Sequence, residues 1–273
     1  MDIIIAGIIY PGLLTALALG VIYWRLVGGA DEHGGASGLG AALRSREGLA
    51  ALAGMLAAAA GLAALPWPAH PAGATRSWLW AWAGIELAFL IPLAPALAAG
   101  VPQVVRAAAR RAQIGAFGRA LLWMAMATSL AIHTEWQIAA LPAHILALGT
   151  TLIAFPIAVG WGPFDDEVSI TGAGVQAGLP PSLRWLDGLA HAVATASLLA
   201  AALIATLPSA SGPAWLGLAQ VAVGFIAVGV LLRQLRGRIP RLTLPAILRF
   251  GWIYVAPLAV AATAALIIAG RPM

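Results

Sequence analysis

The sequence predicts an all-α polytopic membrane protein with about eight transmembrane helices and both termini on the non-cytoplasmic side. The first observation behind this prediction is the composition. Of the 273 residues, 62% are hydrophobic and 9% are charged, and the mean hydropathy is +0.93. A soluble globular chain is about half apolar and about a quarter charged. The polar surface is too small to cover a water-soluble particle, which excludes a cytosolic enzyme, a nucleic-acid-binding domain and a disordered chain.

The second observation is a series of apolar runs, each near the ~20 residues that a helix needs to cross a bilayer. These runs predict eight spans, at roughly 3–27, 48–66, 78–100, 114–133, 138–161, 186–208, 214–234 and 249–270. The run at 48–66 is Ala-rich and short, so seven spans is the main alternative. The first run begins with Met1 and the acidic Asp2, where a signal peptide carries basic residues, and we expect it to be a retained helix. We expect one transmembrane domain over residues 1–273.

The third observation is the distribution of the fifteen basic residues, all of which are Arg. With eight spans, only Arg76 and Arg271 lie on the face that carries the termini. Basic residues gather in cytoplasmic loops, so we expect the odd-numbered loops in the cytoplasm and the termini on the far side. The arginines in or beside the odd-numbered loops are Arg25, Arg44, Arg46, Arg106, Arg110, Arg111, Arg119, Arg184, Arg233, Arg236, Arg238, Arg241 and Arg249.

Few ionisable residues lie inside the predicted spans, where a charge is costly and therefore informative. Glu86 lies near the middle of the third span. One interpretation is a proton-relay carboxylate facing the bundle interior. The other is a protonated Glu hydrogen-bonded to a neighbouring helix, and the sequence leaves both open. Pro92 and Pro95 follow within three turns and weaken the backbone ladder there.

Two further groups of ionisable residues lie near the predicted cytoplasmic ends of spans. Asp165, Asp166 and Glu167 follow the fifth span, where they could collect protons or, as we favour, form a solvated loop or a docking patch for a basic partner surface. Asp187 and His191 lie four residues apart on one helical face and could pair. Such a His can titrate near neutral pH, although a structural pair at a helix end is at least as well supported.

His144 lies about two turns into the fifth span, where a hydrogen-bonded core His is favoured over an exit-side proton relay. No metal-binding spacing such as H-E-x-x-H occurs, so a metal site has no support. Cysteine is absent, so the chain forms no disulfide and holds no thiolate-ligated cluster. Any redox centres of its assembly would therefore belong to other subunits.

Two groups of arginines are candidates for partner docking or for lipid binding at the membrane interface. The first group surrounds the third loop and the start of the fourth span, where Arg119 lies deepest and could pair with a carboxylate. The second group surrounds the last loop. They are Arg106, Arg110, Arg111 and Arg119, and Arg236, Arg238, Arg241 and Arg249.

Three segments together resemble one family. They are GWGPFDDEVSITGAGVQAG, the closing RIPRLTLPAILRFGWIYVAPLAVAATAALI, and RAAARRAQIGAFGRALLW before a middle helix. They resemble the membrane subunit at the quinone end of respiratory complex I and its relatives in energy-converting (group 4) hydrogenases. The resemblance is weakest in the first 75 residues. The chain lacks the family's Arg-x-Gly-Pro element in the first loop, and Gly118 stands where the family usually carries Glu.

The resemblance implies a non-catalytic, divergent subunit of a proton-translocating oxidoreductase in the inner membrane of a prokaryote. It implies hydrophilic redox subunits docked on the cytoplasmic side, iron–sulfur clusters on those partners, antiporter-like membrane neighbours, and no nucleic acid. It further implies that this chain binds no cofactor of its own, with quinone as a candidate ligand at the cytoplasmic edge. The alternatives are a stand-alone transporter and a structural anchor that has lost proton conduction.

Overall fold

The computed structural model describes residues 2–27, 38–72, 78–132, 140–165, 174–207, 213–236 and 238–269. Within these ranges the chain is helical, and eight helical stretches are long and apolar enough to cross a membrane. The predicted count of eight, rather than seven, is therefore confirmed, and the Ala-rich second span forms a regular helix.

The spans are built from the following elements. The first four are α1 (Asp2–Ile8) with α2 (Leu13–Val27), α4 (Arg46–Ala63), α5 (Trp78–Leu90) with η1 (Ile91–Leu93) and α6 (Ala94–Leu97), and α7 (Pro102–Ile132). The last four are α8 (Leu141–Ala158), α9 (Pro181–Thr206), α10 (Ala214–Leu235), and α11 (Leu244–Phe250) with η4 (Gly251–Val255) and α12 (Ala256–Ala269). Short elements between the spans are α3 (Leu39–Ala42), η2 (Gly162–Phe164) and η3 (Gly174–Gln176).

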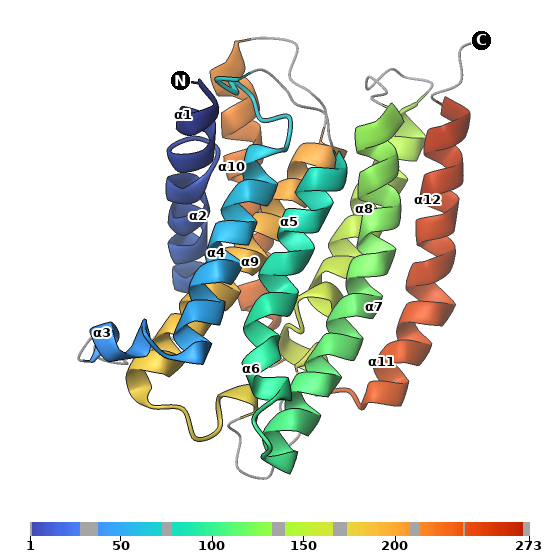
Figure 1. Cartoon of the computed structure of the whole chain (residues 1–273). Coiled ribbons are helices and arrows are strands. Elements are labelled where there is room, and N and C mark those ends of the chain that lie inside the picture. The colour runs from blue at the N-terminus through green and yellow to red at the C-terminus, as the bar shows by residue number, and fades with distance from the viewer. Residues whose placement is uncertain are drawn as a thin grey trace.

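Successive spans run in opposite directions, so the beginning of α1 and the end of α12 lie at the same end of the bundle (Figure 1). The opposite end is called the arginine end. Twelve arginines lie at this end, namely all those assigned above to the odd-numbered loops except Arg119. These arginines lie near the ends of α2 and α10 or near the beginnings of α4, α7, α9 and α11. The placement of this end in the cytoplasm stays a prediction. Arg76 and Arg271 lie outside the described residues.

Helix α9 is the central element, with 78% of its most apolar stretch buried, and it packs against α2, α4, α7, α8 and α10. Glycine allows the closest helix contacts. A Cβ added to Gly84 on α5 would lie 2.6 Å from the Cα of Gly61 on α4, so these two helices touch backbone to backbone. The main core contains side chains from each of the eight spans.

Helix α7 begins at Pro102, whereas the sequence analysis predicted a span that begins at residue 114. The sequence AAARRAQ combines strong helix formers, and Pro102 suits a first helical position. With 31 residues, α7 is about 46 Å long, which exceeds the ~30 Å hydrocarbon core. Arg106, Arg110 and Arg111 therefore lie in the first turns of a long helix rather than in a loop.

The last span contains a π segment, Gly251–Val255, in which the backbone N–H of Ala256 donates to the carbonyl of Gly251. The π segment leaves three consecutive side chains exposed, those of Trp252, Ile253 and Tyr254. The ring of Phe117 on α7 packs over Gly251, where an added Cβ would lie 2.1 Å from its Cε1 atom. The π segment thus lies against α7 at the level of Phe117.

Candidate functional site

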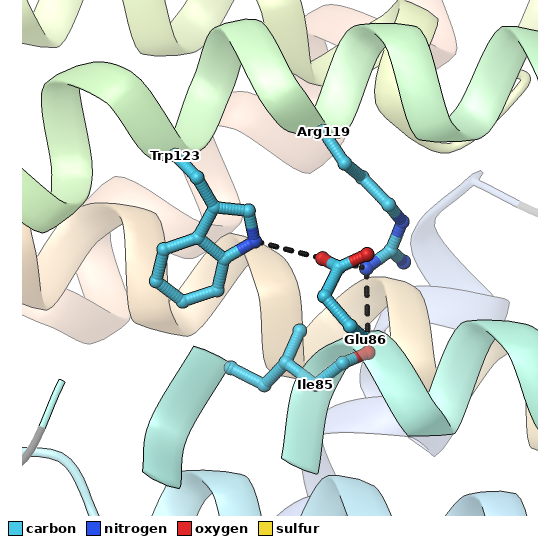
Figure 2. A network of polar contacts seen from close by, with 4 residues as sticks. All are labelled: Ile85, Glu86, Arg119 and Trp123. Atoms are coloured by element: carbon cyan, nitrogen blue, oxygen red, sulfur yellow. Dashed lines mark hydrogen bonds and ion pairs between the residues drawn. The ribbon is translucent and has the colours of Figure 1, made fainter. Parts of the chain in front are cut away.

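The best-defined polar group inside the bundle joins Glu86 on α5 to Arg119 and Trp123 on α7 (Figure 2). The Arg119 Nη1 atom lies 3.0 Å from Oε1 of Glu86, and the Trp123 indole Nε1 donates to the same oxygen at 2.8 Å. Arg119 Nη1 also lies 3.3 Å from the carbonyl oxygen of Ile85. Arg119 and Trp123 are four residues apart, so both point from one face of α7 toward α5. We call Glu86, Arg119 and Trp123 the central triad.

In the central triad, Arg119 and Trp123 are buried and Glu86 is partly exposed. Arg119 is 2% exposed and the Glu86 side chain is 16% exposed. The guanidinium carbon of Arg119 lies 4.4 Å from the ring centroid of Phe89, a cation–π distance. Gly115 makes room for that ring, because an added Cβ there would lie 2.2 Å from Phe89 Cζ. Two opposite charges at hydrogen-bond distance give a pair with no net charge, the form in which ions are tolerated inside a protein.

The sequence analysis grouped Arg119 with the docking and lipid-binding arginines, and the structure places it elsewhere. Its burial and its contact with Glu86 leave no guanidinium surface for a partner or a headgroup. The physical reason is depth: Arg119 is the eighteenth residue of the 31-residue α7 and lies beside the mid-span Glu86. Its Nε atom is buried without a hydrogen-bond partner.

His191 on α9 contacts Arg111 on α7 rather than Asp187. The Arg111 guanidinium is hydrogen-bonded to Nδ1 of His191. Because a guanidinium only donates, Nδ1 must accept, and the imidazole is neutral with its proton on Nε2. Asp187 instead accepts a 2.9 Å hydrogen bond from Gln176 Nε2. The structure thus replaces the predicted Asp187–His191 pair with two separate contacts.

These groups follow one another from the arginine end toward the middle of the bundle. Asp187 and His191 are one helical turn apart on α9, Arg111 contacts His191, and Arg111 and Arg119 are about two turns apart on α7. We call the set the polar line: Gln176, Asp187, His191, Arg111 and the central triad. Its members are joined partly by hydrogen bonds and partly by helical spacing.

Asp165 lies apart from the polar line. Its Oδ2 atom is 3.9 Å from Nη2 of Arg241, and the two side chains are 31% and 62% exposed. The preceding turn is fixed by a backbone hydrogen bond of 2.8 Å from Leu242 N to the Pro163 carbonyl. Arg110 donates to the Leu242 carbonyl at 2.9 Å. Asp166 and Glu167 lie outside the described residues.

The remaining predicted residues are dispersed. His144 is buried near the start of α8, at the end of the bundle opposite the arginine end. Arg106, Arg236, Arg238, Arg241 and Arg249 are exposed at the arginine end, as docking or lipid-binding residues must be. Arg236 uses Nη1 to donate to the Val27 carbonyl, the last carbonyl of α2, at 2.7 Å.

Sequence reasoning did not identify Trp123, Phe89, Gln176 or the role of Arg111. Trp123 carried a usable signal, because it lies in mid-span and not at a helix end where membrane tryptophans usually gather. The partners of Glu86 are 33 and 37 residues away along the chain, a distance that spacing rules do not bridge.

Gly118, where the resembled family usually has Glu, lies at the contact of α7 with α8. An added Cβ would lie 2.4 Å from the backbone nitrogen of Ala158, so this position cannot hold a side chain without separating the helices. The carboxylate that pairs with the adjacent Arg119 comes from α5, as Glu86. No protein-family model matches the chain, and no curated protein matches it.

Proposed function

We propose that the chain is an integral membrane subunit of a redox assembly like complex I or an energy-converting hydrogenase, and that its arginine end holds the hydrophilic redox arm. The observation that carries the proposal is the meeting of the three segments on which the resemblance rests. Leu242 of the closing segment is hydrogen-bonded to Pro163 of GWGPFDDEVSITGAGVQAG and to Arg110 of RAAARRAQIGAFGRALLW. Phe164 and Phe250 add an aromatic contact, with ring centroids 6.2 Å apart.

The three segments meet at Leu242, and we call this contact the Leu242 joint. The surface around the joint has the chemistry of a docking site for an acidic partner. Arg106, Arg238, Arg241 and Arg249 are exposed there, and Asp165 is the described acidic residue beside them. Oriented arginines favour carboxylate partners because they form paired hydrogen bonds. The redox centres would belong to the partner, because the chain has no cysteine for iron–sulfur ligation.

In this proposal the polar line contributes to coupled proton transfer. Glu86 is the carboxylate within the central triad, and its Oε1 already accepts from Arg119 and Trp123. A proton path through Glu86 would have to exchange these contacts with Arg119 and Trp123.

A second candidate function is a structural anchor for the redox arm that conducts no protons. Its specific support is the same pairing, since a carboxylate held by a guanidinium and an indole suits a structural role. The absence of space for an acidic side chain at Gly118 favours the same interpretation.

Purification in a mild detergent from native membranes tests the proposal. We expect hydrophilic iron–sulfur proteins to co-purify and to give cluster signals in electron paramagnetic resonance. R106E/R238E should release them, because it reverses two exposed docking charges. A72E adds a charge to an exposed residue at the opposite end and should not. Isolation of a fully active chain without companions would overturn the proposal and favour a transporter.

A double variant that removes both charges of the Glu86–Arg119 pair distinguishes a proton-translocating subunit from a structural anchor. E86Q alone leaves the buried Arg119 charge without a partner, so its effect on transport is confounded with misfolding. E86Q/R119L removes both charges. We expect this variant to assemble with the redox arm and to lower proton transport per electron in reconstituted vesicles. Unchanged transport with normal assembly would exclude Glu86 from the path and leave the anchor.

A further inference from the structure

A second cationic surface lies on the side of the bundle, where the last turn of α2 meets the last turns of α10. Arg236, which follows α10, is hydrogen-bonded to Val27, the last residue of α2, at 2.7 Å. An added Cβ at Gly229 of α10 would lie 3.1 Å from Leu26 Cδ1 of α2. Arg25 is next to Leu26, and Arg233 is one turn beyond Gly229. We call Arg25, Arg233 and Arg236 the α2–α10 seam.

The seam carries three positive charges at the surface of the bundle. All three side chains are exposed. Among the residues that the structure describes, the ion pairs are Arg119–Glu86 and Arg241–Asp165, and no acidic group pairs with Arg25 or Arg233. Arg236 donates one hydrogen bond to the Val27 carbonyl through Nη1, and its guanidinium has further N–H groups that can donate. Within the described residues, the seam therefore presents exposed guanidinium groups that can bind an anion.

The surface next to these arginines is apolar. Val21 and Ile22 of α2 and Ile226 and Val230 of α10 are exposed. These two spans are among the least buried, with 28% and 22% of their apolar stretches inside the bundle (Figure 1, left side). A ligand of the seam therefore needs a negatively charged group next to the arginines and an apolar part next to the exposed aliphatic side chains.

We propose that the α2–α10 seam binds an anionic phospholipid, with its phosphate on Arg25, Arg233 and Arg236 and its acyl chains along the exposed side chains of α2 and α10. Guanidinium groups bind phosphate oxygens in pairs, and basic sites between membrane helices hold anionic headgroups. A water-soluble acidic protein would match the charges but not the apolar surface beside them. The proposal does not depend on the redox partners.

The test uses the full chain, purified in a nonionic detergent, stripped of lipid and titrated with cardiolipin, phosphatidylglycerol or phosphatidylcholine while native mass spectrometry counts bound lipid. We expect both anionic lipids to bind more tightly than phosphatidylcholine. R25Q/R233Q should weaken anionic-lipid binding by about tenfold or more, because each interfacial arginine contributes separately. This variant retains the Arg236–Val27 hydrogen bond, so the helices stay joined.

The matched control is R106Q/R249Q, which removes two exposed arginines from the same end of the bundle but from α7 and α11 (Figure 1). It should change lipid binding by less than about twofold, because Arg106 and Arg249 lie on α7 and α11, outside the α2–α10 seam. Equal weakening by both double variants would mean a general charge effect and would overturn the proposal. Unchanged binding in R25Q/R233Q would overturn it as well.

Two further outcomes are decisive. If R25Q/R233Q does not fold, the single variants R25Q and R233Q are titrated, and each should lose about threefold or more; unchanged binding in both rejects the site. If R25Q/R233Q binds lipid normally but loses an acidic polypeptide that co-purifies with the native chain, the seam is a protein-docking surface. Absence of iron–sulfur partners would contradict the proposed function and leave the lipid measurement unaffected.

Discussion

The described part of the chain contains two contacts between an acidic residue and an arginine, and they differ in depth. In the middle of the bundle, Arg119 and Glu86 lie 3.0 Å apart with side chains 2% and 16% exposed. At the arginine end, Arg241 and Asp165 lie 3.9 Å apart with side chains 62% and 31% exposed. The inner pair is completed by the Trp123 indole, whereas the outer pair is partly exposed at the surface.

This difference shows that the same two types of residue perform different tasks according to their surroundings. Breaking a buried pair leaves a charge that hydrocarbon cannot solvate, so the cost is large. An exposed pair exchanges one set of hydrated contacts for another and contributes little to stability. The inner pair can therefore hold α5 to α7, while the outer pair contributes little to holding the helices together.

The largest expected effect comes from breaking the inner pair on one side. E86Q leaves a guanidinium that cannot lose its proton, and it should lower the free energy of unfolding by about 3–5 kcal/mol. R119L should cost less, because the remaining Glu86 side chain is 16% exposed whereas Arg119 is 2% exposed. E86Q/R119L should recover most of the loss. Unfolding of the purified chain in mixed detergent micelles measures all three, and additive losses would show that the residues are not coupled.

The next effect concerns the indole that completes the central triad. W123F removes a hydrogen bond to a charged group and should cost about 1.5–3 kcal/mol. The matched control is W215F, because Trp215 is 65% exposed at the start of α10, and it should change stability by less than about 0.5 kcal/mol. Equal losses in the two variants would contradict the hydrogen bond to Glu86. Unfolding in micelles again provides the measurement.

A third prediction concerns the close packing around the inner pair. G118A places a methyl group 2.4 Å from the backbone of Ala158 and should cost about 1–3 kcal/mol through overpacking. Gly149 on α8 has no atom within 4 Å of an added Cβ, so G149A should be neutral or stabilise by up to about 1 kcal/mol. Thermal unfolding of both variants provides the measurement, and a tolerated G118A would refute the tight α7–α8 contact.

The smallest effect is expected at the outer pair. R241Q should change the free energy of unfolding by less than about 1 kcal/mol, and high salt should reduce the difference further because exposed charges are screened. Unfolding at low and high ionic strength measures this. A loss comparable to that of E86Q would mean that depth does not separate the two pairs.

Much of the fold follows from composition and spacing. The eight apolar runs correspond to eight helical spans, because a helix is the form that satisfies backbone hydrogen bonds in lipid. The predicted start of α7 is too late, because Arg106, Arg110 and Arg111 suggest a loop while the Ala-rich sequence around them favours helix. The apolar pattern also gives no sign of the break in the first span between α1 and α2, around Pro11.

The candidate site is predicted only in part. Glu86 is recognisable from the sequence because it is a lone carboxylate near the middle of a predicted span. Arg119 is recognisable as its possible partner because it lies within the fourth predicted span and not in a loop. The pair itself depends on how α5 crosses α7, which no local pattern specifies. The Asp187–His191 pair fails for a related reason, because shared helical spacing permits a contact but nearby Gln176 and Arg111 compete for both groups.

The π segment at Gly251–Val255 sets the rotational phase of the last span. A π turn amounts to one residue inserted into an α-helix, and each residue of an α-helix turns the chain by about 100°. The segment therefore lets Phe250 contact Phe164 while Val255 and Ala259 still face the core. Without that extra residue, the side chains before and after the π segment would be rotated by about 100° relative to each other. Either the contact of Phe250 with Phe164 or the packing of Val255 and Ala259 in the core would then be lost.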